Sequence, residues 1–414
     1  MANTLKFGNG QWATGNGTAL AYNDENSNFK PLPFDFTRAS SGTTVNQSGL
    51  IETVGSGIPR IDFLGNTKGA MLLEPSRTNL IENSYLFNSF AFGRSTKTLE
   101  SGINPDGTTD VVLMSATSGT DGTHRAYSDS ISVVNGTTYT ISLFVKKGTS
   151  SKIQFDLLSG GEGGIGFGGS IFDFNNETIT KGFFEVFNDD WYHLKSTGTV
   201  NTTTSTSRMF LYVYDENGNK SFSANGTENM NLFGAQVEQG SYATSYIPTS
   251  GSAVTRVADS CINGGNEQVI NSTEGVLYWE GSLNSLATGV NNEVSISDGS
   301  VQNYITLYYE GGSTSKLTIS SVVASVNVVL LSKVLDQTVN HKAAISWSLN
   351  NYSLWIDGIK EGEDLSASVP TAGTFITTQI DGPLLNRPFY GNVKDIRVYN
   401  TALTDNELAA LTQV

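Results

Sequence analysis

Cysteine, charged residues and clustered basic residues are all scarce in this chain of 414 residues. The single cysteine, Cys261, excludes an internal disulfide and a cysteine-rich metal site, and we interpret it as a small, partly buried apolar residue. Charged residues make up 15% of the chain, and its net charge is −15. Because phosphate groups are bound by clustered Lys and Arg, we predict no nucleic-acid partner and no anionic membrane surface.

Long apolar runs are also missing from the sequence. No stretch of about 18 apolar residues occurs, so we predict no membrane insertion. The first residues lack the apolar core of a signal peptide, which predicts folding in a reducing cytoplasm.

Glycine, aromatic and β-branched residues are abundant. The chain has 44 glycines, and aromatic residues make up 10% of it. This composition is typical of many short strands joined by tight turns, with enough apolar surface to form cores. The length exceeds what one core usually supports. We therefore predict an all-β chain with an N-terminal arm and two β-sandwich (jelly-roll) domains.

Five segments follow from the pattern. Residues 1–36 have too few apolar residues for a core of their own, so they form an arm that docks on a neighbouring chain or packs on the central domain. Residues 37–79 form a β-rich segment that leads into the first sandwich, residues 80–259. Residues 260–273 are a linker, and residues 274–414 form the second sandwich with a short C-terminal helix.

The stretch Leu232–Asp259 organises the central domain. It begins as an alternating strand, with Leu232, Gly234 and Gln236 on one face and Phe233, Ala235 and Val237 on the other. Its phrase Thr255-Arg256-Val257-Ala258 echoes Thr37-Arg38-Ala39-Ser40. We interpret the stretch as the closing strand and exit of this domain.

Three phrases in this part of the chain carry a resemblance: Leu232–Asp259, Glu74–Leu80 and Asp190–Leu194. They resemble the carbohydrate-binding-module-like jelly rolls of tail-fibre, head-fibre and other surface proteins of bacteriophages. The resemblance implies a structural protein made in the host cytoplasm and displayed on the virion surface. Other virion proteins would then contact its N-terminal arm.

The C-terminal part carries a second resemblance. An aromatic hairpin ends at Asp357-Gly358, Tyr390–Asn400 follows, and a helix begins with the capping pair Thr404 and Glu407. This order resembles concanavalin A-like, laminin-G-like jelly rolls. Members bind sugars or proteins or hydrolyse glycans, and many hold a structural Ca²⁺. We find no convincing calcium ligand cluster, so we predict no cofactor and leave structural calcium open.

Candidate glycan-binding residues come from aromatic side chains. In Arg208–Asp215, Met209, Leu211 and Val213 are predicted to face the core, which leaves Phe210, Tyr212 and Tyr214 on the opposite face. Such a row suits the apolar faces of sugar rings, unless loops or a partner chain cover it. The glycine-rich segment 160–169 formally matches a dinucleotide motif, but a strand follows it. We therefore interpret it as a loop with Phe167 at its tip.

In the second sandwich we predict surface candidates at Tyr304, Tyr308, Arg387, Phe389 and Tyr390. Its three tryptophans, Trp279, Trp347 and Trp355, lie within alternating strands and are assigned to the core.

Catalysis is not predicted. Glycoside hydrolysis needs two carboxylates about 5–10 Å apart. The densest acidic group, Glu361–Asp364, follows a turn and is interpreted as a solvated loop. His124, His193 and His341 have no nucleophile or acidic partner at a recognisable spacing. We assign no catalytic residue.

The sequence thus favours a non-enzymatic virion protein whose sandwiches bind host-surface or mucosal glycans. Two alternatives stay open: a capsid or tail decoration protein that packs on its neighbours without a sugar ligand, and a glycan depolymerase. Weak sugar sites gain overall affinity when several copies bind together, so we expect a homo-oligomer, and a trimer is consistent with this expectation.

Overall fold

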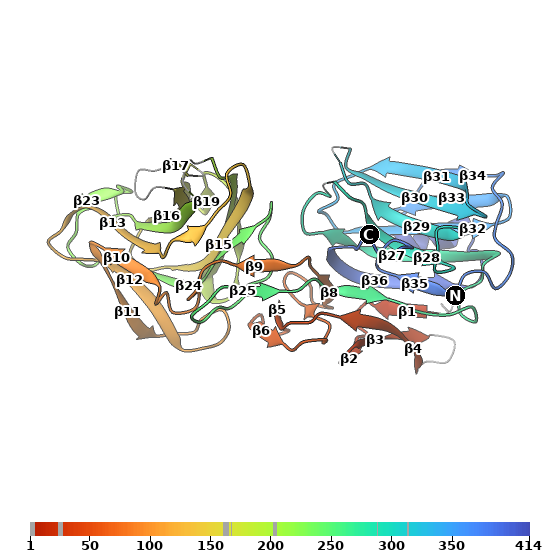
Figure 1. Cartoon of the computed structure of the whole chain (residues 1–414), viewed down its shortest axis with the longest axis horizontal. Helices are drawn as coiled ribbons and strands as arrows, with labels where there is room; N and C mark the ends of the chain where they lie inside the picture. Colours follow the sequence, from red (N-terminus) through yellow and green to blue (C-terminus); the bar gives the residue numbers. More distant parts are fainter. Residues whose placement is uncertain are drawn as a thin grey trace. The chain divides into compact units, whose positions relative to one another are not determined.

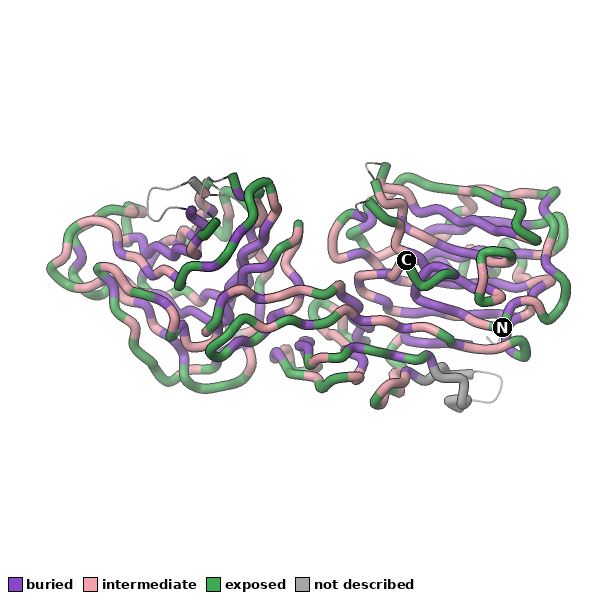
Figure 2. Tube along the Cα trace, in the orientation of Figure 1, coloured by how far each residue is buried: buried purple, intermediate pink, exposed green. Residues whose placement is uncertain are grey.

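The computed structural model describes residues 5–23, 28–159, 165–166, 168–201, 205–287, 289–312 and 314–414. The chain forms two compact units. Unit 1 consists of Met1–Gln47, Val54–Pro75 and Val257–Val414, and unit 2 of Ser48–Thr53 and Ser76–Arg256. Both are built from β-strands (Figure 1), and buried residues run along the strands of each (Figure 2). The prediction of an all-β chain with two β-sandwich domains is confirmed.

Unit 1 contains two large sheets. Sheet 1A has the order β26-β4-β3-β1-β36-β27-β32-β33-β34, with β2 on β3, β8 on β36, and β7 on β8. Its strands are β1 (Leu5–Gly8), β2 (Ala13–Gly15), β3 (Thr18–Asn23), β4 (Asn28–Thr37), β7 (Ile61–Asp62), β8 (Ala70–Leu73), β26 (Ser260–Ile262), β27 (Glu274–Leu283), β32 (His341–Ser348), β33 (Asn351–Ile356), β34 (Ile359–Asp364) and β36 (Gly391–Tyr399). Sheet 1B has the order β31-β30-β29-β28-β35. Its strands are β28 (Asn292–Ser297), β29 (Tyr304–Tyr309), β30 (Lys316–Val323), β31 (Val326–Val334) and β35 (Thr377–Gln379).

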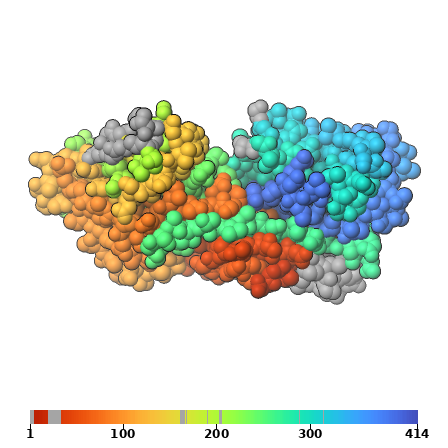
Figure 3. Space-filling view, in the orientation of Figure 1, coloured from red at the N-terminus to blue at the C-terminus, as the bar shows by residue number. Residues whose placement is uncertain are grey.

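The N-terminal strands belong to sheet 1A. β1 pairs with β36, so that Leu5 lies opposite Val398, and β4 pairs with β26. Figure 3 shows the red N-terminal segment beside the green segment that follows unit 2 in the sequence. The structure therefore differs from both predicted placements of the arm, and residues 260–262 are a strand rather than part of a linker. Long-range pairing buries Leu5 and Phe7, which are too few to form a core of their own.

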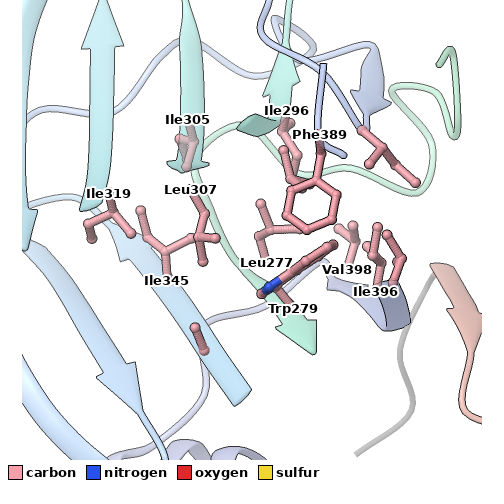
Figure 4. Packing of buried hydrophobic residues seen from close by; sticks show 14 of the residues in the cluster. Leu277, Trp279, Ile296, Ile305, Leu307, Ile319, Ile345, Phe389, Ile396 and Val398 are labelled. Carbon is pink, nitrogen blue, oxygen red and sulfur yellow. The ribbon is translucent and has the colours of Figure 1, made fainter. Parts of the chain in front are cut away.

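The core of unit 1 lies between its two sheets. Ile305 and Leu307 on β29 point toward Leu277 on β27 and Ile345 on β32 (Figure 4). Successive side chains in a strand point to opposite faces. Tyr304, Thr306 and Tyr308, which alternate with Ile305 and Leu307, therefore lie on the outer face of sheet 1B.

A short helix, α1 (Asp405–Thr412), covers part of the outer face of sheet 1A. The carboxylate of Glu407 accepts hydrogen bonds from the backbone N–H of Thr404 at 2.8 Å and from its hydroxyl at 2.6 Å. Leu408 packs against Trp355 and Tyr278 in the layer beneath the helix. The predicted helix and its capping pair are confirmed.

Unit 2 corresponds to the predicted first sandwich and has sheets 2A and 2B and a short pair, β9 (Arg77–Asn79) and β25 (Val254–Arg256). Sheet 2A contains β10 (Phe90–Gly93), β13 (Asp121–Ser128), β14 (Ile131–Ser132), β16 (Lys152–Ser159), β17 (Ile165–Gly166), β18 (Ser170–Asp173), β19 (Thr178–Ile179), β22 (Thr206–Val213) and β23 (Ser221–Ser223). Sheet 2B contains β11 (Ser95–Ser101), β12 (Asp110–Ala116), β15 (Thr138–Lys147), β20 (Phe183–Val186), β21 (Trp191–Thr199) and β24 (Asn229–Gln239). The remaining elements are β5 (Gly42–Val45), β6 (Ile51–Val54) and the 3-10 helix η1 (Asn188–Asp190).

The predicted alternation of β24 is wrong at one point. Met230, Leu232, Ala235 and Val237 all belong to the core of unit 2, so the inward parity changes between Leu232 and Ala235. A β-bulge causes this change, since the pairing register with β15 shifts there. Gly234 adopts a φ of 65°, a left-handed conformation that favours glycine. Phe233 consequently packs on the outer face, 5.4 Å from the ring of Tyr246.

The two arginines of the echoed phrases are both buried. Arg38 donates to Asp259 at 3.0 Å within unit 1. Arg60 joins the same carboxylate at 2.5 Å and pairs with Glu74 at 2.6 Å, so that one buried network ties three distant segments of unit 1 together. In unit 2, Arg256 donates to Thr244 Oγ1 at 3.2 Å. The arginine of each echoed phrase therefore has a structural role within its own unit.

Candidate functional site

The aromatic row of β22 lies where the pattern predicts but is not open. Phe210, Tyr212 and Tyr214 lie on the face opposite the core of unit 2, and each is less than 7% exposed. They form a separate buried cluster with Leu158. Phe210 stacks on Tyr127 at a ring-centroid distance of 5.2 Å.

Polar neighbours complete this cluster. The ammonium of Lys220 lies 3.6 Å from the centre of the Tyr212 ring, and Tyr214 donates its hydroxyl proton to Gln154 at 3.1 Å. A sugar platform requires an exposed ring face, so the expectation of an open aromatic row in unit 2 is wrong. Burial here follows from packing against neighbouring strands of sheet 2A. Phe167, the other candidate in this unit, lies outside the described residues.

In unit 1 the structure brings several predicted residues together on sheet 1B. Tyr304 and Tyr308 lie on the outer face of β29 and are partly exposed, while Ile305 and Leu307 between them are buried. Two residues separated by four positions in a strand are about 13 Å apart. Thr306 lies between the two tyrosines, opposite Ser295 of β28 and Ser320 of β30. The sheet thus presents two partly exposed phenol rings, and the hydroxyl residues Thr306, Ser295 and Ser320 beside them are buried.

A segment before β36 lies over the outer face of β28. Ser295 donates to the carbonyl of Asp381 at 2.7 Å, and Arg387 donates to Glu293 at 2.8 Å. Glu293 is completely buried, whereas 51% of the Arg387 side chain is exposed. The guanidinium therefore has one side fixed on the sheet and another side directed to solvent.

The charge distribution keeps this site protonated and polar. Burial and the nearby carboxylates of Glu310 and Glu293 raise the pKa of Tyr308 to about 12. Burial and Glu293 likewise raise the pKa of Tyr304. The hydrogen bond and charge of Glu293 raise the pKa of Arg387. Near neutral pH both phenols remain hydrogen-bond donors, and the guanidinium remains charged.

We define the tyrosine face as Glu293, Tyr304, Thr306, Tyr308 and Arg387. Rigid aromatic rings beside fixed donors and acceptors can bind a ligand that has both apolar faces and hydroxyl groups. Sequence reasoning identified three of its members but missed strand β28 and hence Glu293. The available signal was a lone acidic residue in the alternating sequence Asn-Glu-Val-Ser-Ile-Ser.

Two other predicted surface residues differ in position. Phe389 is 1% exposed and packs edge-on against Trp279 at 4.6 Å, so its prediction as a surface residue is wrong. Tyr390 is partly exposed, and its backbone N–H donates to Asn292 at 3.2 Å. The tryptophans Trp279, Trp347 and Trp355 are buried, which confirms their assignment to cores.

The predicted acidic loop is a strand. Glu361 and Glu363 lie on the sheet-edge strand β34 and pair with Lys333 and Lys360, respectively.

Each of the three histidines has a structural partner. His124 contacts the carbonyls of Arg94 and Phe222, His193 stacks on Phe144, and His341 contacts Asp357 at 2.6 Å.

Within the described part of the chain, no group of three or more His, Cys, Asp or Glu side chains is arranged to hold a metal ion. Among the same residues, no helix is long and apolar enough to cross a membrane.

No protein-family model and no curated protein matches the sequence. Similar solved structures include the CBM40 of the Ruminococcus gnavus IT-sialidase bound to α2,3-sialyllactose, with 17% identity over 34% of this chain and 83% of that chain, and a TM-score of 0.29. Domain 4 of the Geobacillus stearothermophilus arabinanase AbnA in complex with arabinotriose is 14% identical over 41% and 82%, with a TM-score of 0.32. Domains LG4-5 of the mouse laminin α1 chain are 12% identical over 82% and 92%, with a TM-score of 0.25. Similarities this low assign neither a family nor a ligand to this chain.

Proposed function

We propose that this protein is a non-catalytic glycan-binding component of a bacteriophage particle, and that the tyrosine face of unit 1 is its binding site. The observation that carries the glycan proposal is the pair of partly exposed phenol rings on one strand, beside a half-exposed guanidinium held by a buried carboxylate. The phage proposal is supported by the resemblance of Glu74–Leu80 and Leu232–Asp259 to virion surface proteins.

The chemistry of the tyrosine face suits a sugar. The apolar C–H face of a pyranose ring packs on an aromatic ring, and few rotatable bonds are lost when the ring belongs to tyrosine. Arg387 can donate in a planar fork to ring hydroxyls or to a carboxylate. Since both phenol rings are partly exposed and the Arg387 side chain is half exposed, the face suits repeated weak contacts with a surface glycan, which multivalent display would strengthen.

The test is a glycan-array screen of the recombinant chain, with the supernatant analysed for released sugars. The substitutions Tyr304→Ala and Tyr308→Ala are made separately and together, and Tyr242→Ala provides a partly exposed tyrosine of unit 2 as a matched control. We expect each face variant to lose about 1 kcal/mol or more of binding free energy while the control binds normally, because aromatic contacts dominate such sites.

Three outcomes would each contradict one part of the proposal. Unchanged glycan binding by the double variant would refute the tyrosine face. Released sugars would support the depolymerase instead of the non-catalytic protein. Absence of glycan binding by the folded, oligomeric protein would refute the glycan proposal.

A decoration role has one specific observation in its favour. Leu330 and Val334 of β31, an edge strand of sheet 1B, are 62% and 63% exposed. An exposed apolar edge strand is a common site of protein association. Cosedimentation of the chain with particles, lost in Leu330→Lys and retained in the double tyrosine variant, would support this second role.

A further inference from the structure

The outer face of sheet 1A contains a cleft that the tyrosine face does not use. It is about 380 Å³ in volume and lies beside α1. Its lining residues are Asn9, Asn66, Lys68, Gly69, Tyr278, Glu280, Lys342, Lys394, Arg397, Ala410 and Leu411. Because α1 covers only part of this sheet face, the polar positions of β27, β32 and β36 next to it remain accessible in the cleft.

Hydrogen bonds fix the walls of the cleft. The indole N–H of Trp12 donates to the carbonyl of Lys68 at 2.8 Å, and the ammonium of Lys68 donates to Asn9 Oδ1 at 2.8 Å. The backbone N–H of Asn9 donates to the carbonyl of Lys394 at 2.7 Å. Gly8 is required at this turn, because a Cβ there would lie 2.2 Å from the same carbonyl oxygen. Three separate segments of unit 1 are thereby held around one opening.

The cleft is cationic, although the chain has a net charge of −15. Lys68, Lys342, Lys394 and Arg397 line it, and Glu280 is the only carboxylate in the lining. Arg397 is held by Asp395 at 2.6 Å, which offsets its charge. Three lysines therefore remain against one carboxylate.

The ammonium groups of the three lysines differ in their hydrogen-bond partners. Lys342 donates to the carbonyl of Gln413 at 2.7 Å, which leaves its charge uncompensated by a carboxylate. Lys68 likewise bonds only the neutral amide of Asn9. Among the described residues, the ammonium of Lys394 has no hydrogen-bond or ion-pair partner. The cleft thus combines three cations without a carboxylate partner.

The remaining polar groups of the cleft also favour an acceptor. The Nδ2 group of Asn66 is buried and has no acceptor among the described residues. Both oxygens of Glu280 are occupied, one by the Tyr278 hydroxyl at 3.1 Å and the other by Asn340 at 3.2 Å. A buried donor without a partner is costly, and an anionic oxygen would satisfy it. The accessible chemistry is therefore that of donors and cations.

We propose that this cleft binds an oxyanion, the carboxylate or phosphate group of a small ligand or of a charged polymer. The lysine ammonium groups supply the charge, and Asn66 supplies a directed N–H group. This site lies on sheet 1A, whereas the tyrosine face lies on sheet 1B, so either proposal can fail without the other.

The test uses the full chain and three probes: glucuronate, glucose and inorganic phosphate. Glucuronate and glucose have the same ring and differ in the carboxylate, so the pair isolates the charged group. Binding is measured by titration calorimetry at low ionic strength and again with added salt. The variants are Lys394→Ala, Lys394→Arg and Lys68→Ala, and Lys333→Ala on β31 is the control for loss of one positive charge.

We expect glucuronate, phosphate or both to bind in the low millimolar range, and glucose not to bind. Lys394→Ala and Lys68→Ala should each weaken binding about tenfold, because a hydrogen bond to a charged group contributes about that much. Lys394→Arg and the control should bind nearly normally, and salt should weaken binding.

The two anionic probes, glucuronate and phosphate, also distinguish the source of the oxyanion. Binding of glucuronate alone would assign the cleft to acidic sugars, and binding of phosphate alone to phosphorylated ligands. Equal binding of glucose and glucuronate would overturn the proposal. The proposal would also be overturned if neither glucuronate nor phosphate binds. The same holds if neither lysine substitution weakens anion binding in variants with normal melting temperatures.

Discussion

Arg387 forms an ion pair at 2.8 Å with Glu293, whose side chain is completely buried while half of the arginine is exposed. The arginine thus fixes a buried charge beneath the tyrosine face and keeps donors available at the surface. Asn291 and Thr306 also contact the carboxylate, at 3.3 and 3.5 Å. Because Glu293 is buried and Arg387 is half exposed, substitutions in this pair can affect both the stability of unit 1 and ligand binding.

Arg387→Ala should destabilise unit 1 by about 1–2 kcal/mol, because it leaves the buried carboxylate of Glu293 without its cation. The loss is moderate because solvent already screens the charge of the half-exposed arginine. Adding Glu293→Gln should recover part of this loss. Urea unfolding of the single and double variants measures the coupling. Strictly additive effects would show that the pair does not stabilise the fold.

Tyr212→Ala should destabilise unit 2 by about 3 kcal/mol, because it removes a buried ring and leaves a cavity. Glycan binding by the variant that remains folded should be normal. Differential scanning calorimetry and the glycan array measure the two effects, with Tyr242→Ala as the control. An unchanged melting temperature together with lost glycan binding would instead identify the ring as a ligand platform.

Deletion of residues 1–36 should destabilise unit 1, because it removes the pairing of β1 with β36 and takes the buried rings of Phe7 and Phe34 out of the core. Large-to-small changes at single buried aromatic residues already cost about 3–5 kcal/mol. Limited proteolysis followed by mass spectrometry should show cleavage in unit 1 before unit 2. A deletion variant with normal stability that no longer associates with particles would support a separate docking arm.

Acid should destabilise unit 2 through His193. Burial lowers its pKa to about 4, helped by Lys195 and opposed by Glu185 at 3.7 Å. The unfolded chain, with a pKa of about 6.5, binds a proton in this window that the folded chain does not. Stability therefore falls as the pH drops from about 6.5 towards 4, by up to about 3 kcal/mol.

The measurement is urea unfolding of unit 2 at about pH 7 and about pH 5, for the natural chain and His193→Gln. The variant should lose the stacking on Phe144 at both pH values, but its stability should depend less on pH. Glu185 does not interfere, because its pKa is lowered to about 2 and its stabilisation is lost only below about pH 4.5. Equal slopes for both proteins would contradict the assignment.

Much of the local structure could be predicted from the sequence. The turn at Asp357-Gly358 has φ values of 50° and 84°, as its residue types demand, and the helix cap at Thr404 forms as its spacing predicts. Alternation also identified Leu211 and Trp347 as core residues. These features depend on residues close together in the sequence, so local propensities determine them.

The candidate site was only partly predictable. Alternation separates the two faces of a strand but does not show which face remains open. The rows of Tyr212 and Tyr308 have the same pattern, yet only Tyr308 is partly exposed. The difference depends on neighbouring strands and on their side chains.

By itself, the sequence determined that the chain is all-β, where the turn at Asp357-Gly358 and the C-terminal helix lie, and that residues such as Leu211 and Trp347 enter the cores. Only the tertiary structure decided that β1 joins β36, that Glu293 meets Arg387, and that Lys68 and Lys394 line one cleft. The physical reason is distance along the chain. Strand periodicity is local, whereas these contacts join residues separated by about a hundred positions or more, and the packing of whole sheets sets them.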